Sequence, residues 1–466
     1  MSRKFQCKTI PSRWLETDGR RLDCGPYMTG AIEARELLNK ISALKVPLNE
    51  LTSGIYHAGR ERRTWVSSKD HGIKFMGSTD ILAADLSNLP HISKKQVDLN
   101  PNFKISEGWT LITRSGTIGR MAYARSDMDG LACSEHVMRV VPDLDKVKPG
   151  YIYAYLSSMF GIPLVISGTY GSIIQSIEPH HIVDLPVPRL GKIEDQVHEL
   201  VQKAADLRVE ATSLLKEAGI KVNQTFGFSK KLALSHRSFS CAVASSSNVL
   251  VRMEATFHDG IAQESDRLLD AVPTKDSLID LNVTFAETGR LKQIFVEEEY
   301  GKPFLTSGEI FRQVYAPSRF LSRSLLPGDN SWATQEGDLL LARSGQVGGI
   351  IGRGVWADSR FNNAYVSVDV IRISCQNASI LPGYLYAYLF LTNVGYRQLI
   401  RTAAGSSIPH LSVSDVQKLL IPRSDTAFEE EINDMIWKAG RYRAEAQQLE
   451  DEARVIAERT IKEGGR

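Results

Sequence analysis

The sequence of 466 residues has no long apolar run and little cysteine. No run reaches the ~18–20 apolar residues that a membrane span needs, and the first eight residues contain no apolar stretch of the kind that signal peptides carry. The five cysteines, at positions 7, 24, 133, 241 and 375, are odd in number and lie far apart, and no Cys-x-x-Cys pair suggests a zinc site or a redox couple. We therefore expect a soluble protein of the reducing cytoplasm with mostly buried free thiols.

An excess of charge of either sign is also missing. The 56 basic and 54 acidic residues give a net charge of +2, which excludes a strong overall attraction to a polyanion. A nucleic-acid partner would have to be held by local patches or jointly with another subunit. With 42% hydrophobic and 24% charged residues the composition is globular, and at ~100–200 residues per domain the length allows two to four domains.

Motifs for catalysis are absent as well. The sequence contains no nucleotide P-loop, no Gly-rich methyltransferase cofactor loop with an Asn/Asp-Pro-Pro-aromatic motif, no Gly-x-Ser-x-Gly and no clustered acidic nuclease pattern. The adjacent His180 and His181 have no cysteine or carboxylate at ligand spacing, so they do not indicate a metal site. We predict no catalytic residues, no metal site and no enzymatic activity of the chain alone.

What the sequence does contain is a second copy of itself. Glu-Gly-Trp-Thr-Leu at 107–111 recurs as Glu-Gly-Asp-Leu-Leu at 336–340, and Arg-Ser-Gly at 114–116 recurs at 343–345, both at an offset of 229. Pro-Gly-Tyr-Ile-Tyr-Ala-Tyr-Leu at 149–156 matches 382–389 at an offset of 233, and Pro-Arg at 188–189 matches 422–423 at 234. Matches in one order with so little drift indicate a tandem duplication whose halves meet near residue 235.

Each half ends in a long amphipathic helix with the spacing of a coiled-coil seam. Apolar residues step by four and three along both helices, and the alternation of large and small residues repeats at an offset of 235. We predict that the helices pair through this seam, with charged residues such as Arg208 and Glu450 covering the outer faces. The alternative is that each helix packs only on its own domain. The predicted pairing residues are Leu200, Ala204, Leu207, Ala211 and Leu214 in the first helix and Met435, Ala439, Tyr442, Ala446 and Leu449 in the second.

The region before each helix, ~190 residues long, mixes strand-like and helix-like segments. Branched and aromatic runs that end at glycine turns predict strands, and the segments after the two Pro-Gly pairs predict helices. The fold class is therefore α+β: two similar α/β domains separated by two long antiparallel helices that form a coiled coil, with an internal pseudo-twofold tandem repeat. The predicted ranges are 1–190 for the first domain, 191–227 for the first helix, 228–249 for a linker and the start of the second repeat, 250–424 for the second domain and 425–466 for the second helix.

Basic residues gather in loops at matched positions of the two halves. Residues 57–65 and 91–95 are rich in Arg, Lys and His, and by the offset of 229 Lys94 corresponds to Arg323. Arg and Lys contact phosphates and, by bidentate bonds, guanine edges. A solvated surface loop is the alternative at each single position, and the recurrence favours DNA. The candidate contacts are Arg60, Arg62, Arg63, Lys94 and Lys95 in the first half and Arg319 and Arg323 in the second.

Two kinds of glycine-containing loop recur as well. The Arg-Ser-Gly-x-x-Gly elements at 114–119 and 343–348 can present amides to an anion, but a P-loop opens a helix and here strand-like sequence follows. They indicate a structural hairpin turn from which Arg114 and Arg343 reach a DNA phosphate. The loops at 168–176 and 402–410 are either structural turns or DNA-facing loops, and the sequence does not separate the two. Their candidate contacts are Ser172, Gln175, Ser406 and Ser407.

These motifs in this order, duplicated over nearly the whole chain, resemble the specificity (S) subunit of Type I restriction-modification systems. The resemblance rests on Glu-Gly-Asp-Leu-Leu-Leu-Ala-Arg-Ser-Gly at 336–345, Gly-Tyr-Leu-Tyr-Ala-Tyr-Leu at 383–389, Ala-Gly-Ser-Ser-Ile at 404–408 and Leu-Ile-Pro at 420–422, ahead of a coiled-coil helix. The first half departs from this pattern, with Trp109 at the position of Asp338 and Tyr-Gly-Ser-Ile at 170–173 where the second half has Ala-Gly-Ser-Ser.

The resemblance implies a non-catalytic subunit that binds double-stranded DNA. Each globular domain would be a target recognition domain for one half of a bipartite site, and the helices would dock two methyltransferase (M) subunits. S-adenosylmethionine would bind to the M subunits, and ATP and Mg to restriction (R) subunits where these are present, so no cofactor is expected in this chain. A helix of ~35 residues is ~50 Å long, which corresponds to ~15 base pairs between domain centres. Because the loops of the two halves differ, the target should not be a palindrome.

Two other functions fit parts of the sequence. One is an S-like DNA-recognition subunit of another phage-defence assembly, and the other is a coiled-coil scaffold whose globular parts bind proteins without reading DNA. Steep salt dependence of duplex binding by a complex with M subunits favours DNA reading. No sequence preference in that complex favours the scaffold.

Overall fold

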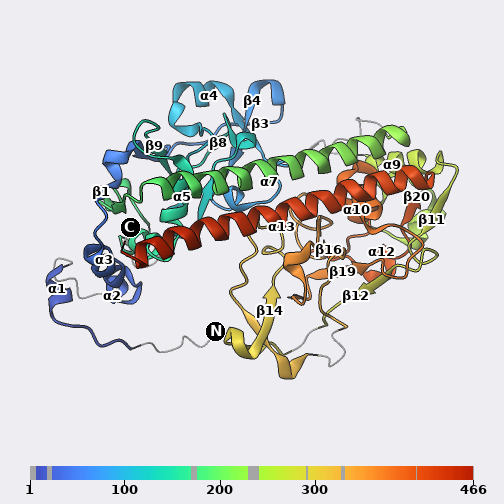
Figure 1. Ribbon diagram of the computed structural model, residues 1–466. Coiled ribbons are helices and arrows are strands. Elements are labelled where there is room, and N and C mark those ends of the chain that lie inside the picture. The colour runs from blue at the N-terminus through green and yellow to red at the C-terminus, as the bar shows by residue number, and fades with distance from the viewer. Residues whose placement is uncertain are drawn as a thin grey trace. The chain divides into compact units, whose positions relative to one another are not determined.

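The computed structural model describes residues 7–17, 24–168, 176–228, 241–289, 292–326, 331–405 and 407–464 (Figure 1). The chain forms two compact units: unit 1 comprises Met1–Val209 and Glu445–Arg466, and unit 2 comprises Glu210–Ala444. The predicted mixture of helices and strands is confirmed, and one long helix spans Lys192–Thr225. Each unit holds a globular part and a stretch of both long helices, whereas the predicted ranges treat the helices as parts of their own.

Unit 1 is built on two four-stranded sheets and one two-stranded sheet. The inner sheet has the strand order β2-β9-β6-β7 and is antiparallel, and β1 pairs with β10. The outer sheet has the order β3-β5-β4-β8, in which β4 and β8 are parallel. The elements are α1 (Arg13–Thr17), α2 (Gly25–Met28), α3 (Ala31–Lys40), β1 (Lys45–Pro47), β2 (Thr52–Tyr56), β3 (Trp65–Val66), β4 (Gly72–Met76), β5 (His91–Ser93), α4 (Lys94–Leu99), β6 (Thr110–Thr113), β7 (Met121–Tyr123), β8 (Ala132–Cys133), β9 (Val137–Pro142), α5 (Pro149–Leu156), α6 (Gly161–Ser167), β10 (Pro186–Pro188), the first part of α7 (Lys192–Thr225) and the last part of α13 (Thr426–Lys462).

Unit 2 contains the remaining parts of α7 and α13 and three sheets of its own. Its inner sheet has the order β12-β19-β16-β17, its outer sheet the order β13-β15-β14-β18, and β11 pairs with β20. The elements are α8 (Ser246–Val251), α9 (Gly260–Asp270), β11 (Lys275–Ser277), β12 (Thr284–Ala286), β13 (Phe295–Val296), β14 (Gly301–Leu305), β15 (Phe320–Ser322), β16 (Leu339–Ala342), β17 (Gly354–Trp356), β18 (Tyr365–Val366), β19 (Val370–Ser374), α10 (Pro382–Leu391), α11 (Asn393–Arg401), α12 (Val413–Val416) and β20 (Leu420–Pro422).

The two units have the same strand order in all three sheets. Both outer sheets contain one parallel pair, β4 with β8 and β14 with β18, and the other pairs are antiparallel. The registers also correspond at the offsets found in the sequence: Gly72–Ser93 with Gly301–Ser322, and Leu111–Arg139 with Leu340–Arg372. Sequence matches of a few residues therefore mark strands that occupy the same place in each unit.

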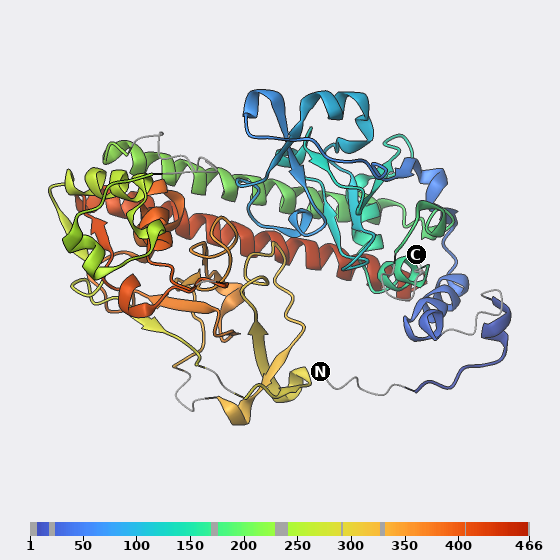
Figure 2. The ribbon, with the colours of Figure 1, turned by 180° about the vertical axis from the view of Figure 1, so that it is seen from behind.

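In each unit the inner sheet lies next to the long helices, and the outer sheet projects away from them (Figures 1 and 2). The last strand of each inner sheet contacts a long helix directly. The Tyr123 hydroxyl donates to Oε1 of Gln202 at 2.9 Å in unit 1, and in unit 2 the rings of Trp356 and Trp437 meet edge to face at 5.0 Å. The outer sheets are therefore the parts of the units that are free to meet a partner away from the helices.

The recurring Pro-Gly pairs allow α5 and α10 to approach the long helices closely. The N–H of Gly150 donates to Nδ1 of His198 at 3.2 Å, and that of Gly383 donates to Oδ1 of Asn433 at 3.0 Å. A Cβ on either glycine would lie 2.8 Å from an atom of that same long-helix residue, which is closer than packed atoms tolerate. Only glycine therefore fits at these two positions.

The recurring Pro-Arg pairs connect a strand to the start of each long helix. Arg189 binds Glu194 with two hydrogen bonds of 3.0 and 2.9 Å, and Arg423 binds Glu429 with two of 2.9 Å. Both glutamates lie in the first helical turn, where the helix dipole favours negative charge. Bidentate pairs of this kind are among the stronger side-chain contacts, so they orient the helices on β10 and β20.

The predicted pairing residues are buried to different degrees. In unit 1, α7 also buries Val197, Val201 and Ala205 in the core beside α5, a face that the coiled-coil pattern does not include. In unit 2, Ile432 and Ile436 of α13 are buried in the corresponding core. Of the predicted residues, Ala204, Leu207, Ala211, Ala439 and Ala446 are buried, and Leu200, Leu214, Met435, Tyr442 and Leu449 are half-buried.

The prediction that Arg208 and Glu450 cover the outer helix faces is wrong. Their side chains are only 5% and 1% exposed, and they form an ion pair within unit 1 in which Nη2 of Arg208 donates to Oε2 of Glu450 at 3.0 Å. The pair also contacts Tyr153 of α5, so the globular part covers the side of the helices that a two-helix pattern assigns to solvent. Lys203 and Glu445, by contrast, form an exposed pair at 2.9 Å.

The prediction that the thiols are mostly buried is also wrong. Cys133 and Cys375 are buried, but Cys7, Cys24 and Cys241 are exposed. The buried pair lies in or next to strands β8 and β19, whereas the other three lie in segments that precede the sheets of their halves. Burial raises the pKa of Cys133 to about 11 and that of Cys375 to about 12.

Among the described residues, no single helix is long and apolar enough to span a membrane. The helices α5 and α6 meet the length and composition requirement only as a pair with a bend of 71°. Seven residues of α5 are buried in unit 1. The described ranges include no group of three or more His, Cys, Asp or Glu that could hold a metal ion.

Candidate nucleic-acid interface

Four of the predicted DNA contacts are exposed on the outer sheet of unit 1. Arg60 and Arg62 precede β3, and Lys94 and Lys95 begin α4. The two lysines border a surface hollow of about 390 Å³. Its lining residues are Asp70, His71, Ser93, Lys94, Lys95, Asp98 and Leu99. The exposed basic side chains therefore lie before β3 and at the start of α4, in the outer part of unit 1.

Neutral amide side chains hold the backbone of the segment before β3. Gln96 accepts from the N–H of Thr64 and donates to the carbonyl of Arg62, both at 2.9 Å. Asn100 donates to the carbonyl of Ala58 at 2.9 Å. Because these contacts use only the backbone of Arg62, its guanidinium remains exposed.

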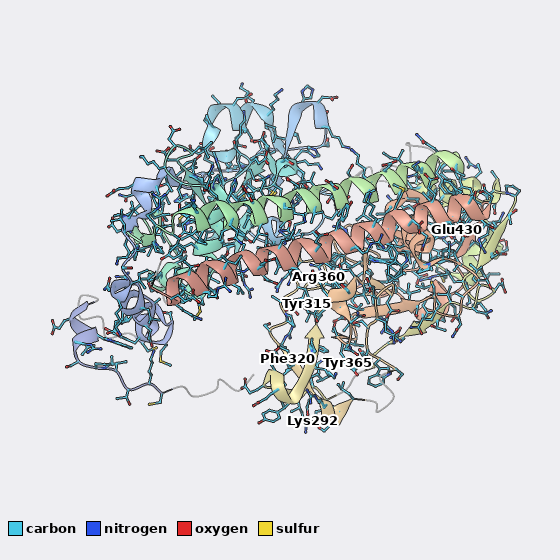
Figure 3. The ribbon with its side chains drawn as sticks, viewed as in Figure 1. Lys292, Tyr315, Phe320, Arg360, Tyr365 and Glu430 are labelled. Atoms are coloured by element: carbon cyan, nitrogen blue, oxygen red, sulfur yellow. The ribbon has the colours of Figure 1, made fainter. Side chains whose placement is uncertain are left out.

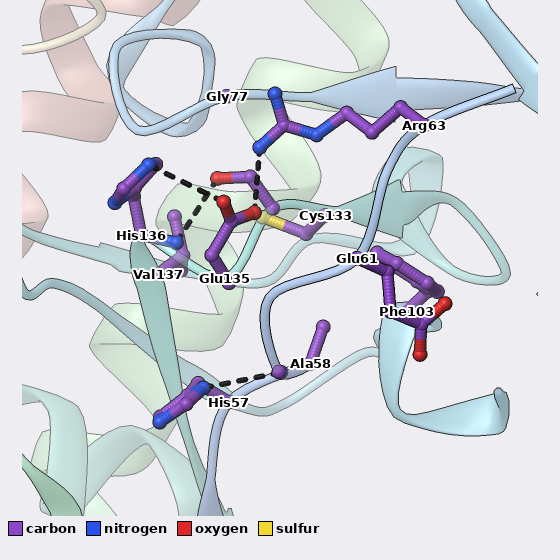
Figure 4. A network of polar contacts seen from close by, with 12 residues as sticks. His57, Ala58, Glu61, Arg63, Gly77, Phe103, Cys133, Glu135, His136 and Val137 are labelled. Carbon is purple, nitrogen blue, oxygen red and sulfur yellow. Dashed lines mark hydrogen bonds and ion pairs between the residues drawn. The ribbon is translucent and has the colours of Figure 1, made fainter. Parts of the chain in front are cut away.

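Arg63 differs from its neighbours because it is held in place (Figure 4). Its Nη2 donates to Oε2 of Glu135 at 2.5 Å, and its guanidinium lies 4.9 Å from the centre of the Phe75 ring. Burial by itself would raise the pKa of the Glu135 carboxyl, but hydrogen bonds from its own N–H and from Arg63 hold the pKa below its usual range. Glu135 also lies 3.4 Å from Nε2 of His136. The carboxylate is therefore ionised at neutral pH and fixes the arginine.

The outer sheet of unit 2 carries a similarly held arginine. Nη2 of Arg319 donates to Oε2 of Glu309 at 3.0 Å. Arg323 is exposed, and its Nε donates to the carbonyl of Gly301 at 3.4 Å. Lys292, which corresponds to Arg63 by the offset of 229, is exposed at the same end of unit 2 (Figure 3).

The prediction that Arg114 reaches a DNA phosphate is wrong. Arg114 is 2% exposed, and its Nε donates to the carbonyl of Ile177 at 2.9 Å and its Nη1 to that of Glu135 at 3.3 Å. Its Nη2 pairs with the Glu178 carboxylate, which lies 3.2 Å from Nε2 of His57. Arg114 connects the turn after β6 to the segment that contains Ile177 and Glu178, as expected of a structural turn.

Arg343 makes the equivalent contacts but remains half-buried. Its Nε donates to the carbonyl of Leu411 at 3.0 Å, and its Nη1 pairs with Glu287 at 3.1 Å. The side chain is 24% exposed, so contact of Arg343 with a phosphate stays a prediction. In each unit the arginine of Arg-Ser-Gly is neutralised by a carboxylate from a different segment.

In unit 2 the Arg-Ser-Gly turn and the 402–410 loop lie together. Oγ of Ser344 is 2.7 Å from Nδ1 of His410, and Gln346 donates to the carbonyl of Ser407 at 2.8 Å. Ser407 is exposed, as are the apolar side chains of Val347 and Ile408, at 47% and 56%. The other loop candidates, Ser172, Gln175 and Ser406, lie outside the described residues.

Sequence reasoning missed the carboxylates and rings that fix Arg63 and Arg319. Glu135 is 72 residues from Arg63, and no local pattern links positions that far apart. Trp65 and Phe295 are 51% and 37% exposed. These two aromatic residues are 230 positions apart, close to the repeat offset of 229, and this spacing is the one sequence signal that could have identified the rings.

No protein-family model and no curated protein matches the sequence. Three solved structures align with it over most of their length. The S subunit of a Type I restriction-modification system from M. genitalium aligns at 11% identity, over 91% of this chain and 96% of its own, with a TM-score of 0.36. The HsdS subunit from Thermoanaerobacter tengcongensis aligns at 15% identity, over 90% and 95%, with a TM-score of 0.28.

The third aligned chain belongs to a structure of complex assembly and conformational transition in the type I R-M system. It aligns at 12% identity, over 90% of this chain and 96% of its own, with a TM-score of 0.29. The sequence resemblance and these alignments name the same class of protein.

Proposed function

We propose that the chain is the DNA sequence-specificity subunit of a Type I restriction-modification complex. Units 1 and 2 would each recognise one half of a bipartite site. The observation that supports this most is that both units have the same strand order and register but carry different side chains on their outer sheets. A scaffold repeated for packing alone does not require such divergence at its surface.

The divergence concerns charge as well as shape. By the offset of 229, Lys69 and Asp70 of unit 1 correspond to Glu298 and Glu299 of unit 2. All four residues are exposed, and they form part of the short turns before β4 and β14. The unit 1 pair is neutral whereas the unit 2 pair is negatively charged, so the two surfaces should not bind the same sequence in the same way, and we expect an asymmetric target.

In this proposal the chain is a tandem duplication that binds DNA without catalysing a reaction. Its two long helices form a coiled coil that docks two M subunits through exposed charged residues, such as Glu199 and Lys203 of α7 and Glu430 of α13 (Figure 3). The M subunits bring S-adenosylmethionine, and R subunits, where present, bring ATP and Mg. We place the complex in the cytoplasm, where it contributes to phage defence.

Adenine methylation provides the direct test. The chain is co-expressed with a candidate M subunit from the same source, in a host that lacks other methylation, and the genome is sequenced for methylated adenine. We expect one asymmetric motif in two parts with an unspecified gap, and no methylation when this chain is omitted. Methylation that is independent of this chain, or a complex without sequence preference, would contradict the proposal and favour a protein-binding scaffold.

Lys94 and Lys95 should increase the affinity for duplex DNA without affecting which sequence is bound. Replacing Lys94 and Lys95 by alanine removes two candidate phosphate contacts, so the salt dependence of binding should fall by about one unit of slope per lost contact. Binding should weaken by a similar factor for target and unrelated duplexes. The control is Lys148→Ala. It removes an exposed lysine near α7 that lies 3.7 Å from Asp195. An equal effect of this variant would exclude a local role for Lys94 and Lys95.

A further inference from the structure

Both outer sheets carry an arginine, a carboxylate and two aromatic rings in contact with one another. In unit 1 these are Arg63, Glu135, Phe75 and Trp65, which we call the unit 1 platform. Arg63 lies 4.9 Å from the centre of the Phe75 ring, and the ring of Trp65 meets that of Phe75 edge to face at 5.3 Å. Glu135 holds the guanidinium from one side at 2.5 Å.

The unit 2 platform consists of Arg319, Glu309, Phe304 and Phe295. The guanidinium lies 5.6 Å from the centre of the Phe295 ring and 5.8 Å from that of Phe304. The two rings are 5.5 Å apart, and Glu309 binds the arginine at 3.0 Å. Arginine, carboxylate and rings therefore recur as a set.

Duplication accounts for the rings but not for the charged residues. The aromatic positions correspond at offsets of 229 and 230, whereas Arg63 corresponds to Lys292 and Arg319 corresponds to Pro90. The carboxylates come from different segments as well, one after β8 and the other after β14. The same kinds of side chain are therefore brought together from different positions in the two units, which points to a shared use.

Both platforms are open to solvent on one side. The side chains of Arg63 and Arg319 are 28% and 25% exposed, and those of Trp65 and Phe295 are 51% and 37% exposed. A guanidinium has five N–H donors in one plane. A carboxylate on Nη2 fixes that plane and leaves further donors for a ligand.

A fixed guanidinium beside an exposed ring suits the edge of a base. Arginine binds O6 and N7 of guanine with two hydrogen bonds, and an apolar side chain contacts the methyl group of thymine. Fixing the guanidinium before binding lowers the entropy lost on association. We propose that Arg63 and Arg319 each recognise a guanine, one in each half-site, and that they determine specificity; this inference rests on the proposed function.

The test compares lysine variants in the complex of the full chain with its M subunits. Arg63→Lys keeps the charge but loses the planar pair of donors. We expect target binding to weaken about 10- to 100-fold, the contribution of one bidentate contact. The preference at one G·C pair of one half-site should be lost with an unchanged salt dependence, and Arg319→Lys should do the same in the other half-site. Arg267→Lys, in an arginine of α9 that is 74% exposed and belongs to neither platform, is the matched control and should alter no preference.

The outcomes separate this inference from the proposed function. If both lysine variants keep the wild-type preference at every base pair, the platforms serve packing only and the inference is overturned, while the proposed function stands. A wild-type complex without preference overturns the proposed function itself. Glu135→Gln keeps Arg63 but removes the carboxylate charge that fixes its guanidinium. This variant should weaken the preference at the same base pair as Arg63→Lys does. A lost preference that is accompanied by a lower unfolding temperature in both variants counts against the inference.

Discussion

Replacing Glu450 by alanine should lower the free energy of unfolding by about 3–5 kcal/mol, the usual cost of removing one partner from a buried ion pair. The change leaves the guanidinium of Arg208, whose side chain is 5% exposed, without the carboxylate that neutralises it. Arg454 lies 3.9 Å from the same carboxylate and would lose an attraction too. Chemical denaturation of the chain, followed by circular dichroism, measures the effect.

Glu445→Ala is the matched control because Glu445 forms the corresponding exposed contact with Lys203 between the same two helices. Exposed pairs contribute about 0–1 kcal/mol, so this variant should unfold almost as the wild type does. Replacing both Arg208 and Glu450 by apolar residues of similar size should restore most of the loss, since it leaves no unpaired buried charge. Equal losses for Glu450→Ala and Glu445→Ala would show that burial of the pair does not matter.

The same ion pair sets a pH dependence with a defined sign. Burial by itself would raise the pKa of Glu450, but the charge and hydrogen bonds of Arg208 outweigh it and hold the pKa below the ordinary value of 4.5. A carboxyl whose pKa is lower in the folded state stabilises the fold above its unfolded pKa, and this contribution is lost as the pH falls through the folded pKa. The stability difference between wild type and Glu450→Ala should therefore be full at neutral pH and should shrink in acid.

The pair also shows where prediction from the sequence reaches its limit. The heptad pattern locates the two helices and several buried positions, because spacing along a helix determines which residues share a face. It cannot show that a third element, α5, covers another face. Arg208 and Glu450 were for this reason assigned to solvent, although Glu450 lies against Tyr153.

Because the sequence repeats internally, the strands were easier to predict than the side chains of the candidate DNA interface. Glycines that recur, such as Gly150 and Gly383, lie against corresponding positions of the long helices, His198 and Asn433, so a match in sequence corresponds to a match in structure. The platform arginines do not recur at matched positions, and their carboxylates come from distant or unrelated segments. Arg63 was predicted from local charge alone, and its partner Glu135 depends on the folded outer sheet. Local composition finds basic segments, but which arginine is held and which is free is a property of the tertiary structure.

Exchanging residues 1–190 for the same domain of another subunit of this class should change one half of the methylated motif and leave the other half unaltered. All candidate contacts of unit 1 lie in this range, and the range ends just before α7 begins at Lys192. The exchanged domain must carry Pro-Gly at the start of its α5, because only glycine at position 150 fits against His198. Methylated-adenine sequencing of a host that expresses the chimera with the M subunits measures the result.

The reciprocal exchange of residues 250–424 is the control and should change only the other half. We expect this because each platform arginine lies in the same unit as the carboxylate that binds it. A chimera in which both halves change would mean that base recognition in one unit depends on the sequence of the other. A chimera that methylates the original motif would place base recognition outside the exchanged domain, and Arg63 and Trp65 could then have no part in it.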